Sequence, residues 1–253
     1  MSERNGEAPR ARPVLRVEGL YKRFGAVTVA SDLDLTVEKC SCLGVIGPNG
    51  AGKTTLFNLI DGALAPDAGR IILDGVDITA LPQYRRAQRG VARAFQIPQP
   101  FFALSVYENV LIAATFSAKL AGVVAVRWAM SVLERTGLAK KHSAIAGRLP
   151  LLERKRLELA RAIAARPKLL MLDEIAGGLT EPEVHDLVSL IRELKADHSI
   201  IWIEHIAHAL TATADTLMVL HFGAKIAEGE PNAILRSPEV RQIYLGIAAD
   251  ATA

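Results

Sequence analysis

The sequence contains very little cysteine, which limits the metal sites that it can build. Only Cys40 and Cys42 occur among the 253 residues, and no cluster of Cys or His near them completes a set of zinc ligands. If this stretch is a strand, the two thiols lie on one face of it. We therefore expect both to be small buried side chains.

Long apolar runs are also missing. No run approaches the roughly 18 to 20 residues that a membrane-spanning helix needs. The opening residues, MSERNGEAPRARP, lack the apolar middle section of a secretion signal. Residues 1–12 mix Arg, Glu, Pro and Gly without apolar periodicity, which is typical of a mobile arm. We expect a cytoplasmic protein whose ordered part begins near residue 13.

A large excess of charge of either sign is absent as well. The chain has 30 Lys and Arg residues against 27 Asp and Glu residues, and the formal net charge is +3. This is too small to indicate a polyanionic partner. The basic cluster RRAQRGVAR at 85–93 is short, so we expect no nucleic-acid partner.

The pattern of apolar residues predicts an α/β protein with an inserted helical part. Residues 14–41 alternate apolar and polar side chains as antiparallel strands do, and CLGVI at 42–46 is continuously apolar, as in a buried parallel strand. Residues 97–165 have helical spacing and form the predicted helical subdomain. The predicted α/β core then comprises 13–96 and 166–253, where the apolar strands KLLMLDE, SIIWIEH and TLMVLHFG alternate with helices.

Residues 47–55, GPNGAGKTT, fit the phosphate-binding motif G-x-x-x-x-G-K-[ST] between a predicted strand and a predicted helix. Glycines allow backbone N–H groups to wrap around phosphate oxygens. Lys53 adds a full charge near the β- and γ-phosphates, and the Thr54 hydroxyl can ligate Mg²⁺. A turn that merely caps a helix is the alternative, and Lys and Thr together argue against it. We expect ATP to contact Gly47, Pro48, Asn49, Gly50, Ala51, Gly52, Lys53, Thr54 and Thr55.

Two carboxylates follow the buried strand LLMLDE at 169–174. Ligands bind at the carboxyl ends of parallel strands, so Asp173 is a candidate for holding the metal ion. Glu174 lies one residue further on, where it can polarise a water molecule for in-line attack. The alternative for Glu174 is a helix cap or a solvated turn residue.

These motifs occur together in the order and approximate spacing of ATP-binding cassette (ABC) ATPases. The phosphate loop, FQ at 95–96, LLMLDE and IIWIEH at 200–205 carry the resemblance, which covers nearly the whole chain after residue 12. The resemblance implies a RecA-like P-loop NTPase core with an N-terminal antiparallel β subdomain and an inserted α-helical subdomain. It also implies ATP hydrolysis with Mg²⁺ as cofactor.

The resemblance assigns roles to three further residues. It implies that Phe24 stacks on adenine, although a core phenylalanine is about as good an interpretation. Gln96 would join Thr54 and Asp173 around Mg²⁺. His205, after the strand that precedes it, would contact the γ-phosphate and the attacking water, so the implied catalytic set is Glu174, His205 and Gln96.

Finer patterns are similar to the branch of the family that energises uptake of branched-chain amino acids, whose members also serve amides, urea and aromatic acids. They are GVARAFQ, SVYENVLIAA, RLELARAIAARPKLLMLDE and PEVRQIYLG. The resemblance implies a second ABC ATPase subunit, membrane permease subunits and, indirectly, a solute-binding protein, with this chain peripheral on the inner face of the membrane. The segment IPQPFFALSVYENV after Gln96 is the predicted permease contact. Phe101 and Phe102 fit either a groove for a permease helix or the core of the helical subdomain.

The sequence departs from the family at its signature, which is usually LSGGQ and often LPYGE in this branch. The matching stretch is LPLLE at 149–153, with Leu152 where glycine is expected. A side chain there would crowd a phosphate or change a backbone that only glycine adopts easily. Ile175 and Thr180 also replace residues common in the family.

The altered signature suggests an asymmetric heterodimer. In this family each ATP lies between the phosphate loop of one subunit and the signature of the other. This chain's own site would be completed by a partner's intact signature, and the site that it completes for the partner would be weak. A homodimer remains possible. A regulatory module without turnover and an ATPase acting on nucleic acid or ribosomes are the alternatives.

Overall fold

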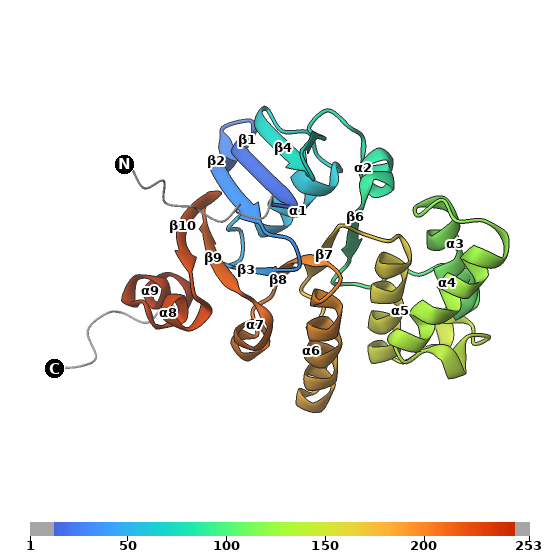
Figure 1. Ribbon diagram of the computed structural model, residues 1–253. Coiled ribbons are helices and arrows are strands. Elements are labelled where there is room, and N and C mark those ends of the chain that lie inside the picture. Colours follow the sequence, from blue (N-terminus) through green and yellow to red (C-terminus); the bar gives the residue numbers. More distant parts are fainter. Residues whose placement is uncertain (1–12, 246–253) are drawn as a thin grey trace, which may run out of the picture.

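The computed structural model describes residues 13–245, so the arm predicted at 1–12 lies outside the described residues. Two sheets organise the chain (Figure 1). The first is antiparallel, with the order β2-β1-β4-β5. Its strands are β1 (Leu15–Phe24), β2 (Val27–Val37), β4 (Ala68–Leu73) and β5 (Val76–Asp77). It is the N-terminal antiparallel part that the alternating sequence predicted.

The second sheet has the order β10-β9-β3-β8-β7-β6. Its strands are β3 (Cys42–Ile46), β6 (Val91–Ala94), β7 (Leu169–Asp173), β8 (Ser199–Ile203), β9 (Thr216–His221) and β10 (Ala224–Gly229). Strands β9, β3, β8, β7 and β6 are parallel, and β10 pairs antiparallel to β9. The carboxyl ends of the parallel strands therefore share one edge.

The parallel sheet is buried on both faces, and its side chains alternate between two cores. Met171 and Ile201 pack into the core shared with the antiparallel sheet and α1 (Lys53–Asp61). Leu170 and Trp202 point into the larger core on the opposite face. The period-2 geometry of strands explains this division, and burial on both faces explains why these strands read as continuous apolar runs.

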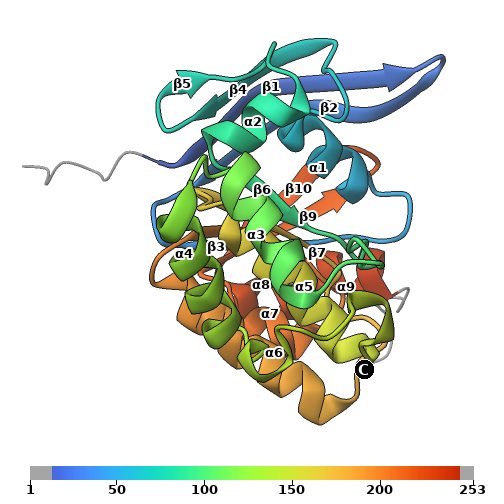
Figure 2. The ribbon, with the colours of Figure 1, turned by 90° about the vertical axis from the view of Figure 1, so that its right-hand side faces the viewer.

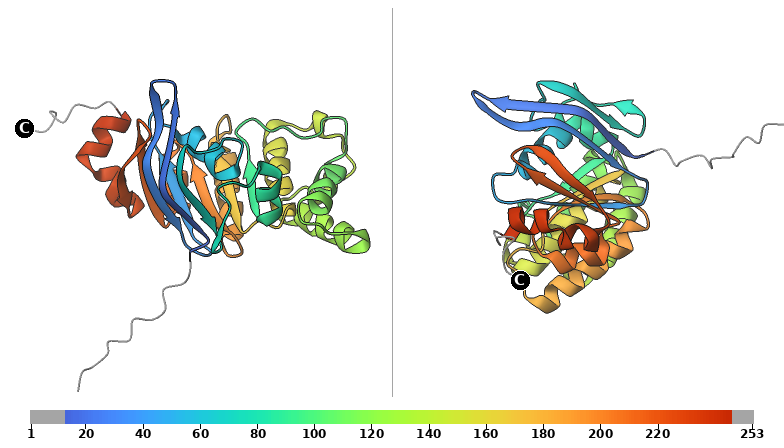
Figure 3. Two further views of the ribbon diagram at one scale, coloured as in Figure 1. Left: turned by 90° about the horizontal axis from the view of Figure 1, so that it is seen from above. Right: turned by 90° about the vertical axis from the view of Figure 1, so that its left-hand side faces the viewer.

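Most of the remaining helices lie on the opposite face of the sheet or at its two ends, whereas α2 lies on the side of the antiparallel sheet (Figures 1 and 2). Helices α3, α4 and α5 form a group at the β6 end, and α8 and α9 lie near β10 at the other end (Figure 3). Their bounds are α2 (Gln83–Arg89), α3 (Val106–Phe116), α4 (Gly122–Arg135), α5 (Leu151–Ala164), α6 (Glu181–Lys195), α7 (Ala207–Thr213), α8 (Pro231–Arg236) and α9 (Pro238–Leu245), with short 3₁₀ turns at Ala139–Lys141 and Ala146–Arg148. No helix within 13–245 has the length and apolarity needed to cross a membrane.

The predicted fold class is confirmed, but three local features differ from expectation. Strand β6 and helix α2 were not anticipated, because Arg93 interrupts the short apolar pattern of β6. Cys40 is also not a buried strand residue, so that prediction was wrong. It is exposed in the turn before β3 with φ of 55°, whereas Cys42 is buried in the strand.

The different surroundings of the two thiols predict different reactivity. Burial raises the pKa of Cys42 to about 12, and the thiolate is the reactive form. We expect a chromogenic thiol reagent to label one cysteine per native chain and both cysteines after unfolding. Cys40→Ser should abolish labelling of the native chain. Rapid labelling of native Cys40→Ser would contradict the buried position of Cys42.

Candidate nucleotide-binding site

The predicted phosphate loop connects β3 to α1 and packs closely against neighbouring backbone. A Cβ atom on Gly47 would lie 2.2 Å from the carbonyl oxygen of Leu220 in β9, so glycine is required there. Gly50 has φ of 80°, and a Cβ atom built on it has nothing within 4 Å. Helix α1 begins after Gly52 without a side-chain cap. The loop thus combines an open position with the uncapped N-terminus of a helix, as an anion site requires.

Lys53 folds back over the loop. Its ammonium donates hydrogen bonds to the carbonyl oxygens of Gly47 at 2.7 Å and Pro48 at 3.1 Å. Burial lowers the pKa of Lys53, while the charges of Glu174 and Asp173 act in the opposite direction. The two predicted carboxylates therefore act on the lysine of the phosphate loop.

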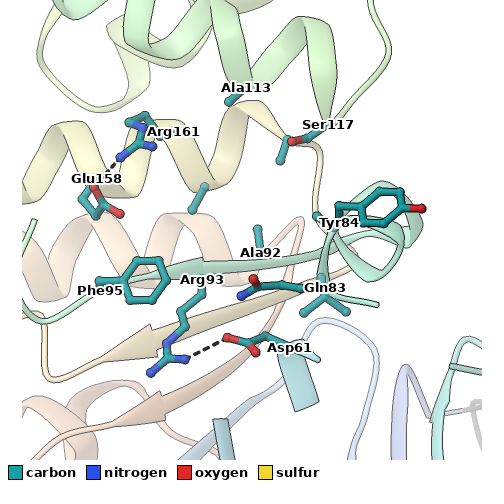
Figure 4. A pocket seen from close by; sticks show the side chains of 14 residues that line it. Asp61, Gln83, Tyr84, Ala92, Arg93, Phe95, Ala113, Ser117, Glu158 and Arg161 are labelled. Atoms are coloured by element: carbon teal, nitrogen blue, oxygen red, sulfur yellow. Dashed lines mark hydrogen bonds and ion pairs between the residues drawn. The ribbon is translucent and has the colours of Figure 1, made fainter. Parts of the chain in front are cut away.

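Asp173 ends β7 and is held by an arginine that the sequence motifs did not identify. Arg93 in β6 donates to Asp173 Oδ2 at 2.5 Å and to Asp61 Oδ2, at the end of α1, at 2.8 Å. The same guanidinium donates to Asn58 at 2.8 Å and lies over the rings of Phe57 and Phe95. Figure 4 shows Arg93 extending from β6 toward Asp61. One cation therefore joins β6, β7 and α1.

Glu174 follows Asp173 in a conformation that is rare for a residue other than glycine, with φ of 45°. Such backbone conformations cost roughly 1–3 kcal/mol and cluster at functional sites. Its carboxylate accepts a hydrogen bond from Gln96 Nε2 at 2.7 Å, and His205 Nδ1 lies 3.9 Å from it. The predicted catalytic residues Glu174, Gln96 and His205 thus lie together, at the ends of β7, β6 and β8.

The position of His205 depends on a buried carboxylate that the sequence analysis did not single out. Glu204 is 1% exposed, and its two oxygens accept from the backbone N–H groups of His205 at 2.9 Å and Ala176 at 3.1 Å. It therefore links the segment after β8 to the segment after β7. The imidazole of His205 is itself exposed and lies 3.4 Å from Glu204.

Three further residues predicted to contact the nucleotide or its metal ion are exposed or half-buried. Thr54 is exposed in the first turn of α1, and Thr55 is half-buried. Phe24 is 53% exposed at the end of β1, with Lys22 Nζ 5.5 Å from its ring centre. The alternative that Phe24 fills the core is therefore wrong, and its stacking on adenine stays a prediction.

Comparison with known proteins agrees with this arrangement. The profile of the ABC transporter family matches residues 30–177. The high-affinity branched-chain amino acid transport ATP-binding protein BraF of Pseudomonas aeruginosa is 38% identical over 254 residues, covering 94% of this chain and 100% of BraF. This chain belongs to the ABC transporter family. The prediction of an ABC-type ATPase is thereby confirmed.

Two further relatives extend the ABC comparison. The ATP-binding protein LivG of Escherichia coli, also named for high-affinity branched-chain amino acid transport, is 35% identical over 254 residues, covering 94% of this chain and 100% of LivG. The crystal structure of a nucleotide-free ATP-binding cassette from an ABC transporter has a TM-score of 0.84 and 31% identity, covering 93% of this chain and 100% of that one. Both matches cover more than nine-tenths of this chain.

The altered ABC signature forms the beginning of α5. Leu149 is buried, Pro150 is the N-cap residue, and Leu151 and Leu152 begin the helix. Neither leucine has a positive φ, so the backbone here does not need glycine. The difference from the family therefore lies in the side chains. Leu151 is 39% exposed and stands where LSGGQ has its first glycine and LPYGE has tyrosine.

Helix α5 is also bound to the segment that follows Gln96. Lys155 Nζ donates to the Gln96 carbonyl at 3.2 Å, and Arg161 donates to the Gln99 carbonyl at 2.8 Å. Burial lowers the pKa of Lys155 and raises the pKa of Glu158, which pairs with Arg161 at 2.8 Å. A groove of about 350 Å³ lies beside this segment, between α2, β6 and α5 (Figure 4). The backbone of Gln96 is thus tied to α5.

The sequence contains one indication that Arg93 has a structural role, which is its charged side chain within an otherwise apolar strand. Its partners Asp61 and Asp173 lie far from it in sequence, so their contact could not be inferred from spacing. The basic cluster at 85–93 has a similar explanation at Arg86. That side chain is 1% exposed and donates to the carbonyls of Leu59 and Ile60. Two of the four arginines in the cluster, Arg86 and Arg93, therefore bind groups in the interior of the chain.

Replacing Arg93 with Met should destabilise the chain strongly. It leaves the buried carboxylates of Asp61 and Asp173 without their cation, and breaking a buried pair costs about 3–5 kcal/mol. Urea unfolding measures this loss, and adding Asp61→Asn should recover part of it. The control is Arg89→Met on the exposed face of α2, expected within about 0.5 kcal/mol of the unchanged chain. Equal stability of the two variants would contradict the role of Arg93.

Proposed function

We propose that this ABC ATPase energises an importer for branched-chain amino acids or related small solutes. The similarity to BraF and LivG over the whole chain supports this solute class. The observation that carries the proposal is the gathering of Lys53, Asp173 and the Glu174–Gln96 pair at one edge of the sheet. The chain acts at the inner face of the membrane as a peripheral subunit.

ATP binds with its phosphates on the loop at 47–55. The open position at Gly50 and the uncapped start of α1 fit an anion, and the ammonium of Lys53 exchanges its loop carbonyls for phosphate oxygens. Thr54, Asp173 and Gln96 would hold Mg²⁺, which when bound neutralises charge on the β- and γ-phosphates. The Gln96 amide donates to Glu174, so its carbonyl oxygen is the atom left for a metal ion.

Glu174 orients the attacking water and accepts its proton. Gln96 and His205 hold the Glu174 carboxylate in place from the ends of β6 and β8. The strained backbone of Glu174 directs its side chain away from β7 toward these two residues. Phe24 contributes an exposed ring at the end of β1 for stacking on adenine.

The ATPase works as an asymmetric heterodimer. This chain's phosphate loop is completed by the intact signature of a second ABC ATPase. In return, it presents Leu151 and Leu152 to the partner's nucleotide, and the side chain of Leu152 occupies space that glycine leaves for phosphate. Turnover therefore takes place mainly at the site built from this chain's Glu174.

The permease subunits contact the groove beside the segment that follows Gln96. Phe101 is 48% exposed and Phe102 is 51% exposed, so neither fills the helical core. Both lie on the segment that Arg161 and Glu158 hold against α5, which gives the permease a route to Gln96. A solute-binding protein would act only indirectly, through the permease.

One alternative keeps support from the structure. The leucines at the start of α5 also suit a nucleotide-binding regulatory module without turnover. The complete set of Glu174, Gln96 and His205 favours the ATPase instead. A nucleic-acid-associated ATPase is disfavoured, because Arg86 and Arg93 of the basic cluster bind internal groups.

The deciding experiment compares ATP turnover by this chain alone with turnover when it is co-expressed with a signature-intact partner ATPase and permeases. We expect turnover in the complex and its loss by about 10²- to 10⁴-fold with Glu174→Gln, the size of a general-base contribution. Equal turnover by the chain alone would show that LPLLE works as a signature. No turnover in either state would favour the regulatory module.

A second experiment restores the signature. In the purified homodimer, Leu151→Tyr with Leu152→Gly changes LPLLE to LPYGE, and we expect turnover to rise by about 10- to 100-fold. The control is Val123→Gly, at an exposed position in the first turn of α4, which weakens a helix start elsewhere. Unchanged turnover in the restored variant would argue that the leucines do not limit hydrolysis.

A further inference from the structure

Three side chains that the nucleotide site does not use meet where α6 and α7 pack together. Glu181 and His185 are on α6, and His208 is on α7. The two helices lie side by side below the sheet in Figure 1. One potential metal-ligating atom from each of the three side chains lies within 4.8 Å of the others.

The local sequence places each of these ligands. Thr180 is the N-cap residue of α6 and forms a capping box with Glu183, which fixes Glu181 at the first helical position. His185 is four residues later and therefore lies on the same face one turn along. Helix α7 begins at Ala207, so His208 projects from its first turn.

The distances are those of a nearly assembled metal site. Glu181 Oε1 lies 3.2 Å from His208 Nε2 and 3.8 Å from His185 Nε2. Ligand atoms of a tetrahedral zinc ion, at about 2.0–2.1 Å from the metal, are separated by about 3.4 Å. The imidazole rings are tilted by 33° and their centres are 6.1 Å apart, so they do not stack face to face. Small side-chain rotations bring all three atoms around one ion.

The surroundings leave the cluster open to an ion from solution. The side chains of Glu181, His185 and His208 are 68%, 72% and 48% exposed. They line a surface groove of about 490 Å³, and among its lining residues Glu181 is the one acidic side chain. Arg192 also lines the groove, about two turns of α6 beyond His185.

A simple ion pair between Glu181 and His185 is common on helix surfaces and contributes little to stability. The third group is what changes the interpretation, because His208 comes from a different helix and approaches the carboxylate more closely. Two imidazole nitrogens and one carboxylate oxygen are ligands that suit Zn²⁺, and three protein ligands leave a fourth position for water. This set is hard to recognise in the sequence, because His208 lies 23 positions after His185.

We propose that Glu181, His185 and His208 form a Zn²⁺-binding site that joins the first two turns of α6 to the first turn of α7. Bound Zn²⁺ ties the segment after Thr180 to the segment that carries His205, three residues before His208. The proposal does not depend on which solute is transported or on ATP turnover, because its test measures metal binding.

The test titrates Zn²⁺ into the untagged full chain in competition with a chromophoric chelator, without nucleotide or Mg²⁺. A Cys40→Ser background removes the exposed thiol, which would otherwise compete for Zn²⁺. We expect one saturable Zn²⁺ per chain, weakened at least about tenfold by His185→Ala, by His208→Ala and by Glu181→Gln. The control is His142→Ala, at an exposed histidine outside the cluster, which should leave affinity unchanged.

Co²⁺ provides a second readout of geometry. Its visible absorption distinguishes a low-coordinate site from hydrated Co²⁺, and we expect the low-coordinate spectrum to vanish with His208→Ala. The proposal is overturned if Cys40→Ser binds no Zn²⁺, or if the three ligand variants bind it as tightly as His142→Ala. Circular dichroism of each variant shows that loss of binding does not reflect unfolding.

Discussion

The guanidinium of Arg93 lies between two buried carboxylates, Asp61 at the end of α1 and Asp173 at the end of β7. Three elements that are distant in the sequence are thereby held at fixed positions around the phosphate loop. Strand β6, which carries Arg93, continues into Gln96, and Gln96 contacts Glu174. A buried charge that loses its partner is costly, so the placement of both carboxylates and of Gln96 depends on this one cation.

The chain has the phosphate-loop motif of the ABC family, but its signature sequence is altered. Its phosphate loop, Glu174 and His205 lie at the carboxyl ends of parallel strands, whereas the first turn of α5 carries Leu151 and Leu152. The two regions are nevertheless connected, because Lys155 and Arg161 of α5 bind the backbone that follows Gln96. The backbone that follows β6 is thus held to α5 by hydrogen bonds as well as by the apolar core that the two elements share.

Much of the fold and of the candidate site could be predicted from local sequence. The loop at 47–55 encodes its function in consecutive residues, and the continuous apolar runs of β3, β7 and β8 reveal strands buried on both faces. Strand β6 and helix α2 were harder to predict because Arg86 and Arg93 appear polar in sequence but bind internal carbonyls and carboxylates. Cys40 was misplaced for a related reason, since the period of a strand does not show where the strand begins.

The sequence by itself determined the family, the phosphate loop and the order of Asp173, Glu174 and His205, because neighbouring residues and strand ends specify these features. Tertiary structure decided which side chains meet across elements. The contacts of Arg93 require β6 to pair with β7, and the meeting of Glu181 with His208 requires α6 to pack against α7. The exposure of Phe101 and Phe102 was likewise settled by packing. Proximity between distant residues arises from strand order and helix packing, and the spacing of residues along a chain does not contain it.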